Sequence, residues 1–121
     1  MTFTNKAEMT DSGKSVIVTK VFDHGCEICE QMRRHDKVTF EEFPEIAYQE
    51  VVLDDVIDHQ NNLTKLRLYQ CLERHALNPD YTIDLPVYVF ISRQGQFKGC
   101  HVGAATIVEL RDKTKEILGK T

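Results

Sequence analysis

The sequence has no long apolar run and no concentration of positive charge. No stretch approaches the roughly 20 apolar residues that a membrane-spanning helix needs. The first residues, Met1 to Lys6, lack the apolar core of a signal peptide. Lysine and arginine number 15 against 19 acidic residues, which gives a net charge of −4, and the basic residues are scattered. We therefore expect a cytoplasmic protein that binds neither membranes nor nucleic acid.

Tryptophan is absent, and only 4 cysteines occur among 121 residues. In a reducing compartment, cysteines are more often catalytic, metal-bound or simply buried than joined in structural disulfides. The chain is long enough to bury one hydrophobic core. We expect one domain spanning residues 1–121, and a monomer.

Apolar periodicity and turn residues predict the order of the secondary-structure elements. The predicted elements are a short helix at 5–9, a buried strand at 15–22, a helix from Cys26 to about Ala47, a strand at 48–53, a helix at 61–77, a strand at 87–92, a hairpin turn at 93–95, a strand at 96–102, and a helix between Thr106 and Gly119. Asp54-Asp55 marks the end of the second strand, Asp58 or Asn61 caps the helix at 61–77, and Thr106 caps the last helix. The apolar residues of the last helix that are available for burial are Val108, Leu110, Ile117 and Leu118.

One acidic residue interrupts the apolar face of the helix that begins at Cys26. Cys29, Met32, Phe40 and Phe43 share that face, and Asp36 occupies the position where the next apolar residue is expected. The sequence from Thr39 to Glu42 also has the form of a capping box. We interpret this pattern as a helix that bends or restarts near residues 36–39.

The connections predict the topology of the sheet. The first two strands, joined through a crossover helix, should be parallel, and the last two should form an antiparallel hairpin. The expected fold is α/β, with a mixed four-stranded sheet and helices on both faces.

Two cysteines stand where the first buried strand gives way to a helix, in the motif Cys26-Glu27-Ile28-Cys29. The first turn of a helix has N–H groups without intrahelical partners, which favour a thiolate there. A cysteine one turn later can close a disulfide with the first or resolve a mixed disulfide. Zinc sites use the same spacing, and His24 and His35 could add two ligands. Their positions make convergence on one ion awkward, so we expect no metal.

At this point the chain resembles the thioredoxin family. The resemblance rests on the strand at 16–22 that leads into Cys26-Glu27-Ile28-Cys29, on Leu85-Pro86 before a strand, on the Gln94-Gly95 hairpin, and on Val102-Gly103-Ala104 before the last helix. It implies a thioredoxin-like fold and a thiol–disulfide oxidoreductase that reduces protein disulfides, an electron-transport role that needs no cofactor beyond its own dithiol. Glutaredoxins are similar in the hairpin region, but this chain has fewer of their glycines there.

The resemblance also implies roles for individual residues. Cys26 would attack the substrate disulfide and Cys29 would resolve the mixed disulfide. Pro86 would follow a cis peptide bond beside Cys26, and Leu85 would meet the substrate chain. A disulfide-containing protein is then the substrate, and a reductase of the thioredoxin-reductase type is a candidate electron donor.

Departures from the family pattern concentrate around the two cysteines. Glu27-Ile28 replaces the usual Gly-Pro, and Lys20 replaces the usual acidic residue in the preceding strand. The resemblance places Lys20 under Cys29, where it would assist Cys29 during exchange. The alternative, which we expect, is that Lys20 extends to the surface or pairs with Glu30 or another carboxylate. His24 should favour the Cys26 thiolate, whereas Glu27 and Glu30 should oppose it. Because the two glutamates make the Cys26 thiolate less stable, and strong oxidants depend on an unusually stable thiolate, we expect a reductant.

A second hypothesis belongs to a different class of protein. The chain would be a thioredoxin-like interaction module, in which the CxxC motif is not catalytic and the extended segment 55–85 binds a partner. Thioredoxins usually carry a tryptophan just before the motif, where this chain has His24-Gly25. The absence of this tryptophan and the acidic, proline-free motif favour this alternative. The retention of both cysteines together with Leu85-Pro86 favours the enzyme.

Overall fold

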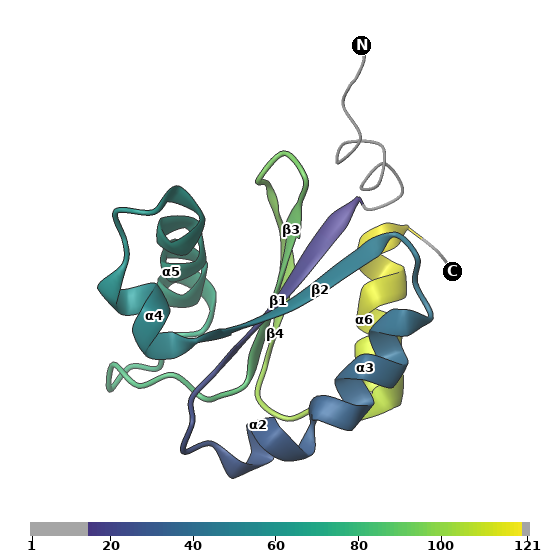
Figure 1. The fold of residues 1–121 in the computed structure, drawn as a ribbon, viewed down its shortest axis with the longest axis horizontal. Coiled ribbons are helices and arrows are strands. Elements are labelled where there is room, and N and C mark those ends of the chain that lie inside the picture. Colours follow the sequence, from purple (N-terminus) through teal and green to yellow (C-terminus); the bar gives the residue numbers. More distant parts are fainter. Residues whose placement is uncertain (1–14, 120–121) are drawn as a thin grey trace.

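The structure is a computed structural model that describes residues 15–119 (Figure 1). The helix predicted at residues 5–9 lies outside this range. The elements, in order, are β1 (Val16–Phe22), α2 (Glu27–Gln31), α3 (Arg33–Glu41), β2 (Ile46–Val52), α4 (Leu53–Asp58), α5 (Leu63–His75), β3 (Val87–Ser92), β4 (Phe97–Val102) and α6 (Ile107–Leu118).

The four strands form one mixed sheet in the order β2-β1-β3-β4. β1 runs parallel to β2, and β3 runs antiparallel to both β1 and β4. Figure 1 shows α4 and α5 on one side of the sheet and α3 and α6 on the other, with α2 beyond the end of β1. The predicted α/β architecture is confirmed, including the parallel pair and the antiparallel hairpin.

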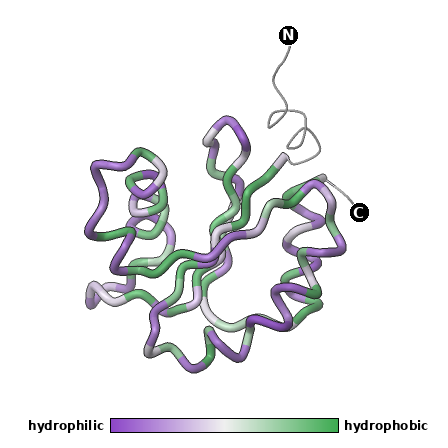
Figure 2. The backbone as a smooth tube through the Cα atoms, in the orientation of Figure 1, coloured by the Kyte–Doolittle hydropathy of each residue, from purple (hydrophilic) through white to green (hydrophobic). Residues whose placement is uncertain are grey.

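Side chains alternate between the two faces of the buried strands, so each face has its own core. The cluster beneath α3 and α6 includes Val16, Val18, Phe40, Phe90 and Leu110. The buried members of the cluster beneath α4 and α5 are Val21, Val56, Leu68, Leu72, Ala76, Val87 and Val89. Figure 2 shows the corresponding apolar colouring along the central strands. By this alternation, Lys20 faces the same side as Val16 and Val18.

The prediction for the first long helix was wrong in two respects. The helix is divided at Met32 into α2 and α3. The predicted break near residues 36–39 is absent, because α3 runs without interruption through them. It also ends at Glu41 instead of near Ala47, and a turn in which the Ile46 N–H donates to the Phe43 carbonyl leads into β2. Asp36 does not break the helix, because it has a buried partner on the sheet.

Two boundaries in the next segment also differ from the prediction. Asp54 and Asp55 do not end a strand; they lie in the first turn of α4, where acidic side chains interact favourably with the helix dipole. The following helix, α5, is shorter than predicted, and its cap is Asn62, whose side chain accepts a hydrogen bond from the Lys65 N–H. None of the helices within residues 15–119 is long and apolar enough to span a membrane.

The start of α6 follows the prediction and provides a test of local stability. The Thr106 hydroxyl accepts from the Glu109 N–H at 3.1 Å, and the Glu109 carboxylate accepts from the Thr106 N–H at 2.8 Å. Thr106→Ala should lower the free energy of unfolding by about 1 kcal/mol, because it leaves the Glu109 N–H without its acceptor. Urea denaturation measures this change. Val108 is 57% exposed, against the prediction of burial, so Val108→Ala is a control that should change stability by less than about 0.5 kcal/mol.

Candidate active site

The two cysteines of the motif are joined in a disulfide at the start of α2. Cys26 is the N-cap residue with extended backbone (φ −89°, ψ 99°), and Cys29 lies one turn into the helix, 5.3 Å away between Cα atoms. The Cys29 N–H points to the Cys26 Sγ at 3.1 Å. Cys26 is half-buried, whereas Cys29 is only 2% exposed. A helix-terminal donor is therefore aimed at the more accessible of the two sulfurs.

The turn before Cys26 is fixed by Asp23. Its carbonyl accepts from the Cys26 N–H at 3.0 Å, and its carboxylate accepts from the His24 N–H at 2.8 Å. The His24 ring is exposed and meets the Phe22 ring edge-on, with centroids 5.7 Å apart. His24 is thus held two residues before Cys26 at the protein surface.

The two glutamates of α2 differ in their surroundings. Both are exposed and both lie in the first turn of the helix. Glu30 forms an ion pair with Arg33 at 3.3 Å, whereas Glu27 forms none within the described residues. Glu27 is therefore the acidic side chain of α2 whose charge is not balanced by a nearby cation.

A buried ion pair lies directly beneath Cys29. Lys20 is 1% exposed, and its Nζ donates to the Asp36 Oδ2 and to the Cys29 carbonyl oxygen, both at 2.6 Å. The prediction that Lys20 lies under Cys29 is confirmed. The predicted pairing with a carboxylate is also confirmed: the partner is Asp36 on α3, not Glu30, and Lys20 does not extend to the surface.

Two tyrosines complete the surroundings of Asp36. The Tyr88 hydroxyl donates to the Asp36 Oδ1 at 2.6 Å, and the Tyr48 hydroxyl lies 3.2 Å from the Oδ2. Burial raises the pKa of both tyrosines, and the negative charge of Asp36 raises it further, so both remain hydrogen-bond donors. The carboxylate thus has three donors, which is how a charge can be accommodated in a protein interior.

The network continues to the surface through Glu50. The Tyr48 hydroxyl is 2.9 Å from the Glu50 Oε2, so its single proton is shared between two carboxylates. Arg33 bonds to the other oxygen of Glu50 at 2.9 Å. Partial burial acts to raise the pKa of Glu50, but the hydrogen bonds from Arg33 and Tyr48 outweigh it and lower the pKa. Because Arg33 also pairs with Glu30, one chain of contacts links the buried ion pair to exposed α2.

The local sequence pattern does not identify which carboxylate pairs with Lys20. Asp36 is an acidic residue on an apolar helix face, and that pattern predicts a break in the helix instead of a buried ion pair. Tyr48, Glu50 and Tyr88 were assigned only to strands. The available signal was a pair of opposite charges, Lys20 in a buried strand and Asp36 on a buried helix face, each of which needs a partner.

Leu85 and Pro86 lie at the head of β3. The bond between them is cis, as the resemblance implied, and Pro86 is buried. Val87 pairs with Val21 of β1, so Pro86 is at the same end of the sheet as the turn that leads to Cys26. The Pro86 carbonyl accepts from the Gly103 N–H at 2.7 Å. Leu85 is half-buried and takes part in no strand pairing among residues 15–119.

The alternative zinc site does not assemble. Within the described part of the chain, no three His, Cys, Asp or Glu side chains are grouped so that they could hold a metal ion. Cys26 and Cys29 are bonded to each other, and His35 is an exposed residue of α3.

Comparison with solved structures identifies the fold. A thioredoxin h from poplar has a TM-score of 0.64 and 21% identity, covering 95% of this chain and 86% of its own. Mitochondrial thioredoxin 3 of Saccharomyces cerevisiae, in oxidised form, has a TM-score of 0.60 and 20% identity, covering 94% and 92%. Fasciola hepatica thioredoxin has a TM-score of 0.58 and 21% identity, covering 91% and 88%. The fold is therefore thioredoxin-like. No protein-family model and no curated protein sequence matches the chain.

The buried ion pair provides a test of how the network is held together. Asp36→Leu should lower the free energy of unfolding by about 3–5 kcal/mol, because it leaves the Lys20 charge buried without a partner. The double variant Lys20→Met/Asp36→Leu should recover much of this loss. Urea denaturation measures both.

The control is the surface pair between Arg111 and Glu42, which are 2.7 Å apart. Arg111→Ala should cost less than about 1 kcal/mol. If the effects of Lys20→Met and Asp36→Leu simply add in the double variant, the two residues are not energetically coupled.

Proposed function

We propose that this chain is a thiol–disulfide oxidoreductase that reduces disulfides in proteins. The Cys26 thiolate attacks one sulfur of the substrate disulfide, which forms a mixed disulfide and releases one substrate thiolate. Cys29 then attacks the Cys26 Sγ, which closes the Cys26–Cys29 disulfide and releases the second substrate thiolate. Two electrons pass to the substrate, and a dithiol donor must return the pair to its reduced form.

The observation that carries this proposal is the unequal placement of the two sulfurs. Cys26 is accessible and has the Cys29 N–H as a donor at 3.1 Å, which favours the thiolate that attacks. Cys29 is buried one turn behind it, so a bulky substrate meets Cys26 first. This division suits a nucleophile and a resolving thiol.

Lys20 acts on the second step in this proposal. Its ammonium group is 2.6 Å from the Cys29 carbonyl oxygen, while its counter-ion Asp36 belongs to another helix. A cation beside Cys29 favours the thiolate that must form there to release the substrate. His24 favours the thiolate of Cys26 in the same way, and the negative charge of Glu27 disfavours that thiolate.

Leu85 and Pro86 provide the edge along which the substrate binds. The backbone of Leu85 is not engaged in strand pairing within the described residues, and it precedes β3 at the end of the sheet that leads to Cys26. An extended substrate segment could pair with such an edge through main-chain hydrogen bonds. A reductase of the thioredoxin-reductase type is the electron donor that we propose.

A second candidate function is a partner-binding module with a non-catalytic CxxC motif. The observation that favours it is the exposure of large apolar side chains in segment 55–85, namely Ile57, Leu63, Leu77 and Tyr81. Tyr81 is 84% exposed with a φ of +66°, and hydrogen bonds among Asn78, Asp80 and Thr82 hold its loop. A partner could cover this surface without any redox step.

The enzyme proposal predicts different outcomes for the two cysteines. The wild-type chain should accelerate insulin reduction by dithiothreitol. Cys29→Ser should accumulate a mixed disulfide between Cys26 and insulin, visible by mass spectrometry, whereas Cys26→Ser should be inactive and trap nothing. Cys71→Ser, which changes a free half-buried thiol on α5, should keep the wild-type rate. No acceleration by the wild-type chain would favour the partner-binding module instead.

Glu27 should slow the reaction of Cys26 through charge repulsion. An exposed charge pair a few ångströms apart is worth on the order of 1 kcal/mol, so Glu27→Gln should speed alkylation of reduced Cys26 by iodoacetamide up to about fivefold at low salt. The effect should vanish at high salt, where exposed charges are screened. Glu73→Gln, an exposed position on α5, is the control and should leave the rate unchanged. An unchanged rate for Glu27→Gln at low salt would remove Glu27 from the proposed mechanism.

A further inference from the structure

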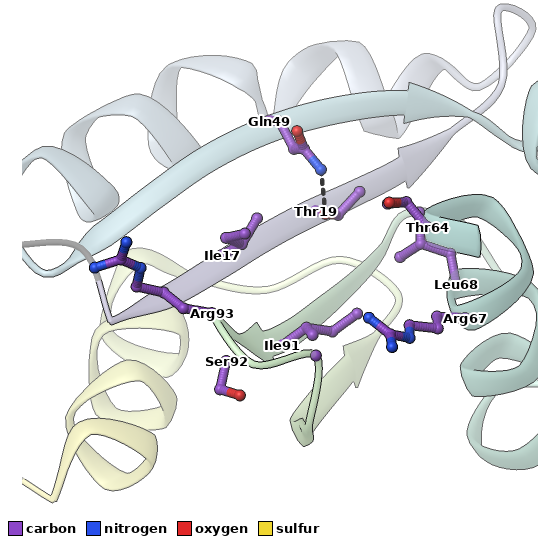
Figure 3. A pocket seen from close by; sticks show the side chains of 10 residues that line it. Ile17, Thr19, Gln49, Thr64, Arg67, Leu68, Ile91, Ser92 and Arg93 are labelled. Atoms are coloured by element: carbon purple, nitrogen blue, oxygen red, sulfur yellow. Dashed lines mark hydrogen bonds between the residues drawn. The ribbon is translucent and has the colours of Figure 1, made fainter. Parts of the chain in front are cut away.

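A pocket lies between α5 and the sheet (Figure 3). It lies toward the end of the sheet opposite to the cysteines. Ile17 is near the start of β1, whereas Cys26 follows its end, and Ile91 is near the end of β3, whereas Pro86 precedes its start. The apolar lining of the pocket consists of Ile17, Leu68 and Ile91. Its volume is about 150 Å³. This space is separate from the proposed redox site.

Polar groups on the wall of the pocket are available to a ligand. Thr19 is 2% exposed, and its hydroxyl accepts from the Gln49 Nε2 at 2.9 Å (Figure 3). The proton of this hydroxyl has no acceptor within the described residues. Thr64, at the start of α5, adds a second hydroxyl to the lining. A buried hydroxyl that can still donate is expected to meet an acceptor.

Arg67 contributes a positive charge to the same pocket. Its guanidinium lies against Gly95 of the β3–β4 hairpin, in the space that a Cβ at residue 95 would occupy. Gly95 has a φ of +88°, so the turn and this close approach both favour glycine. Arg67 makes no hydrogen bond or ion pair with any residue between 15 and 119. Arg93, the other arginine of the lining, likewise forms no ion pair within the described residues, whereas Arg33 and Arg111 pair with glutamates.

We propose that this pocket binds a small organic carboxylate with a compact apolar body. The anion would pair with the Arg67 guanidinium and accept from Thr19, and the apolar body would contact Ile17, Leu68 and Ile91. An apolar cavity of about 150 Å³ accommodates a benzene ring, which sets the size of the ligand. The chain has a net charge of −4 and does not attract anions as a whole. The positive charge of Arg67, which no carboxylate of the described residues neutralises, would attract an anion to this pocket.

The test is a titration of the full-length oxidised chain with benzoate, followed by ¹H–¹⁵N NMR. Saturable shifts should be confined to the amides around Ile17, Thr19 and Leu68, with an affinity of about millimolar order for so small a ligand. Benzamide, which is neutral and of similar shape, should bind at least about tenfold more weakly. Inorganic phosphate, which lacks the apolar body, should also bind at least about tenfold more weakly.

Three variants locate the site. Arg67→Met should weaken benzoate binding at least about tenfold by removing the charge while keeping the length of the side chain. Thr64→Phe should block the pocket from an exposed position and abolish the shifts. Arg74→Met, on the same helix but outside this pocket, should change the affinity less than about twofold. Absence of saturable shifts, equal binding of benzamide, or equal effects of Arg67→Met and Arg74→Met would each overturn the proposal.

Discussion

The ion pair between Lys20 and Asp36 joins three elements around Cys29. Lys20 belongs to β1, Asp36 belongs to α3, and the Cys29 carbonyl belongs to α2. The alternation of β1 turns Lys20 toward α3 instead of toward α5. Because neither charge can be left unpaired in the interior, the position of α3 over the sheet is fixed by this contact as well as by apolar packing. The two-piece helix with its break at Met32 is thereby anchored on both sides of the break.

Lys20 also lies in a polar row that crosses the whole sheet. Its neighbours in register are Glu50 on β2 and Tyr88 on β3, and Tyr88 is paired in turn with His101 on β4. Well-packed apolar residues often replace buried ion pairs without loss of stability. Stability alone therefore does not account for such a row, and its position beneath Cys29 suits the redox function that we propose. Glu50 and Arg33 connect the same row to solvent.

Elements that depend on local signals could be predicted from the sequence, whereas those that depend on distant partners could not. The strand at 87–92 and the Thr106 cap follow from short-range patterns, and both agree with the structure. Asp36 has partners 16 and 52 residues away, so its burial was invisible to periodicity and it was interpreted as a break. The helix α4 was missed for a related reason, since its six residues are too few to establish a helical period.

The proposed reaction places its two cysteines in electrostatic surroundings of opposite kind. Glu27 is exposed near Cys26, where water and salt weaken its repulsion. Lys20 is buried beside Cys29, where the lower effective dielectric constant makes the interaction energy of a unit charge several-fold larger. Asp36 offsets part of this effect, but the Lys20 ammonium donates directly to the Cys29 carbonyl oxygen, so the cation of the pair is the member that contacts Cys29. The buried pair should therefore influence the resolving step more strongly than the exposed glutamate influences the attack.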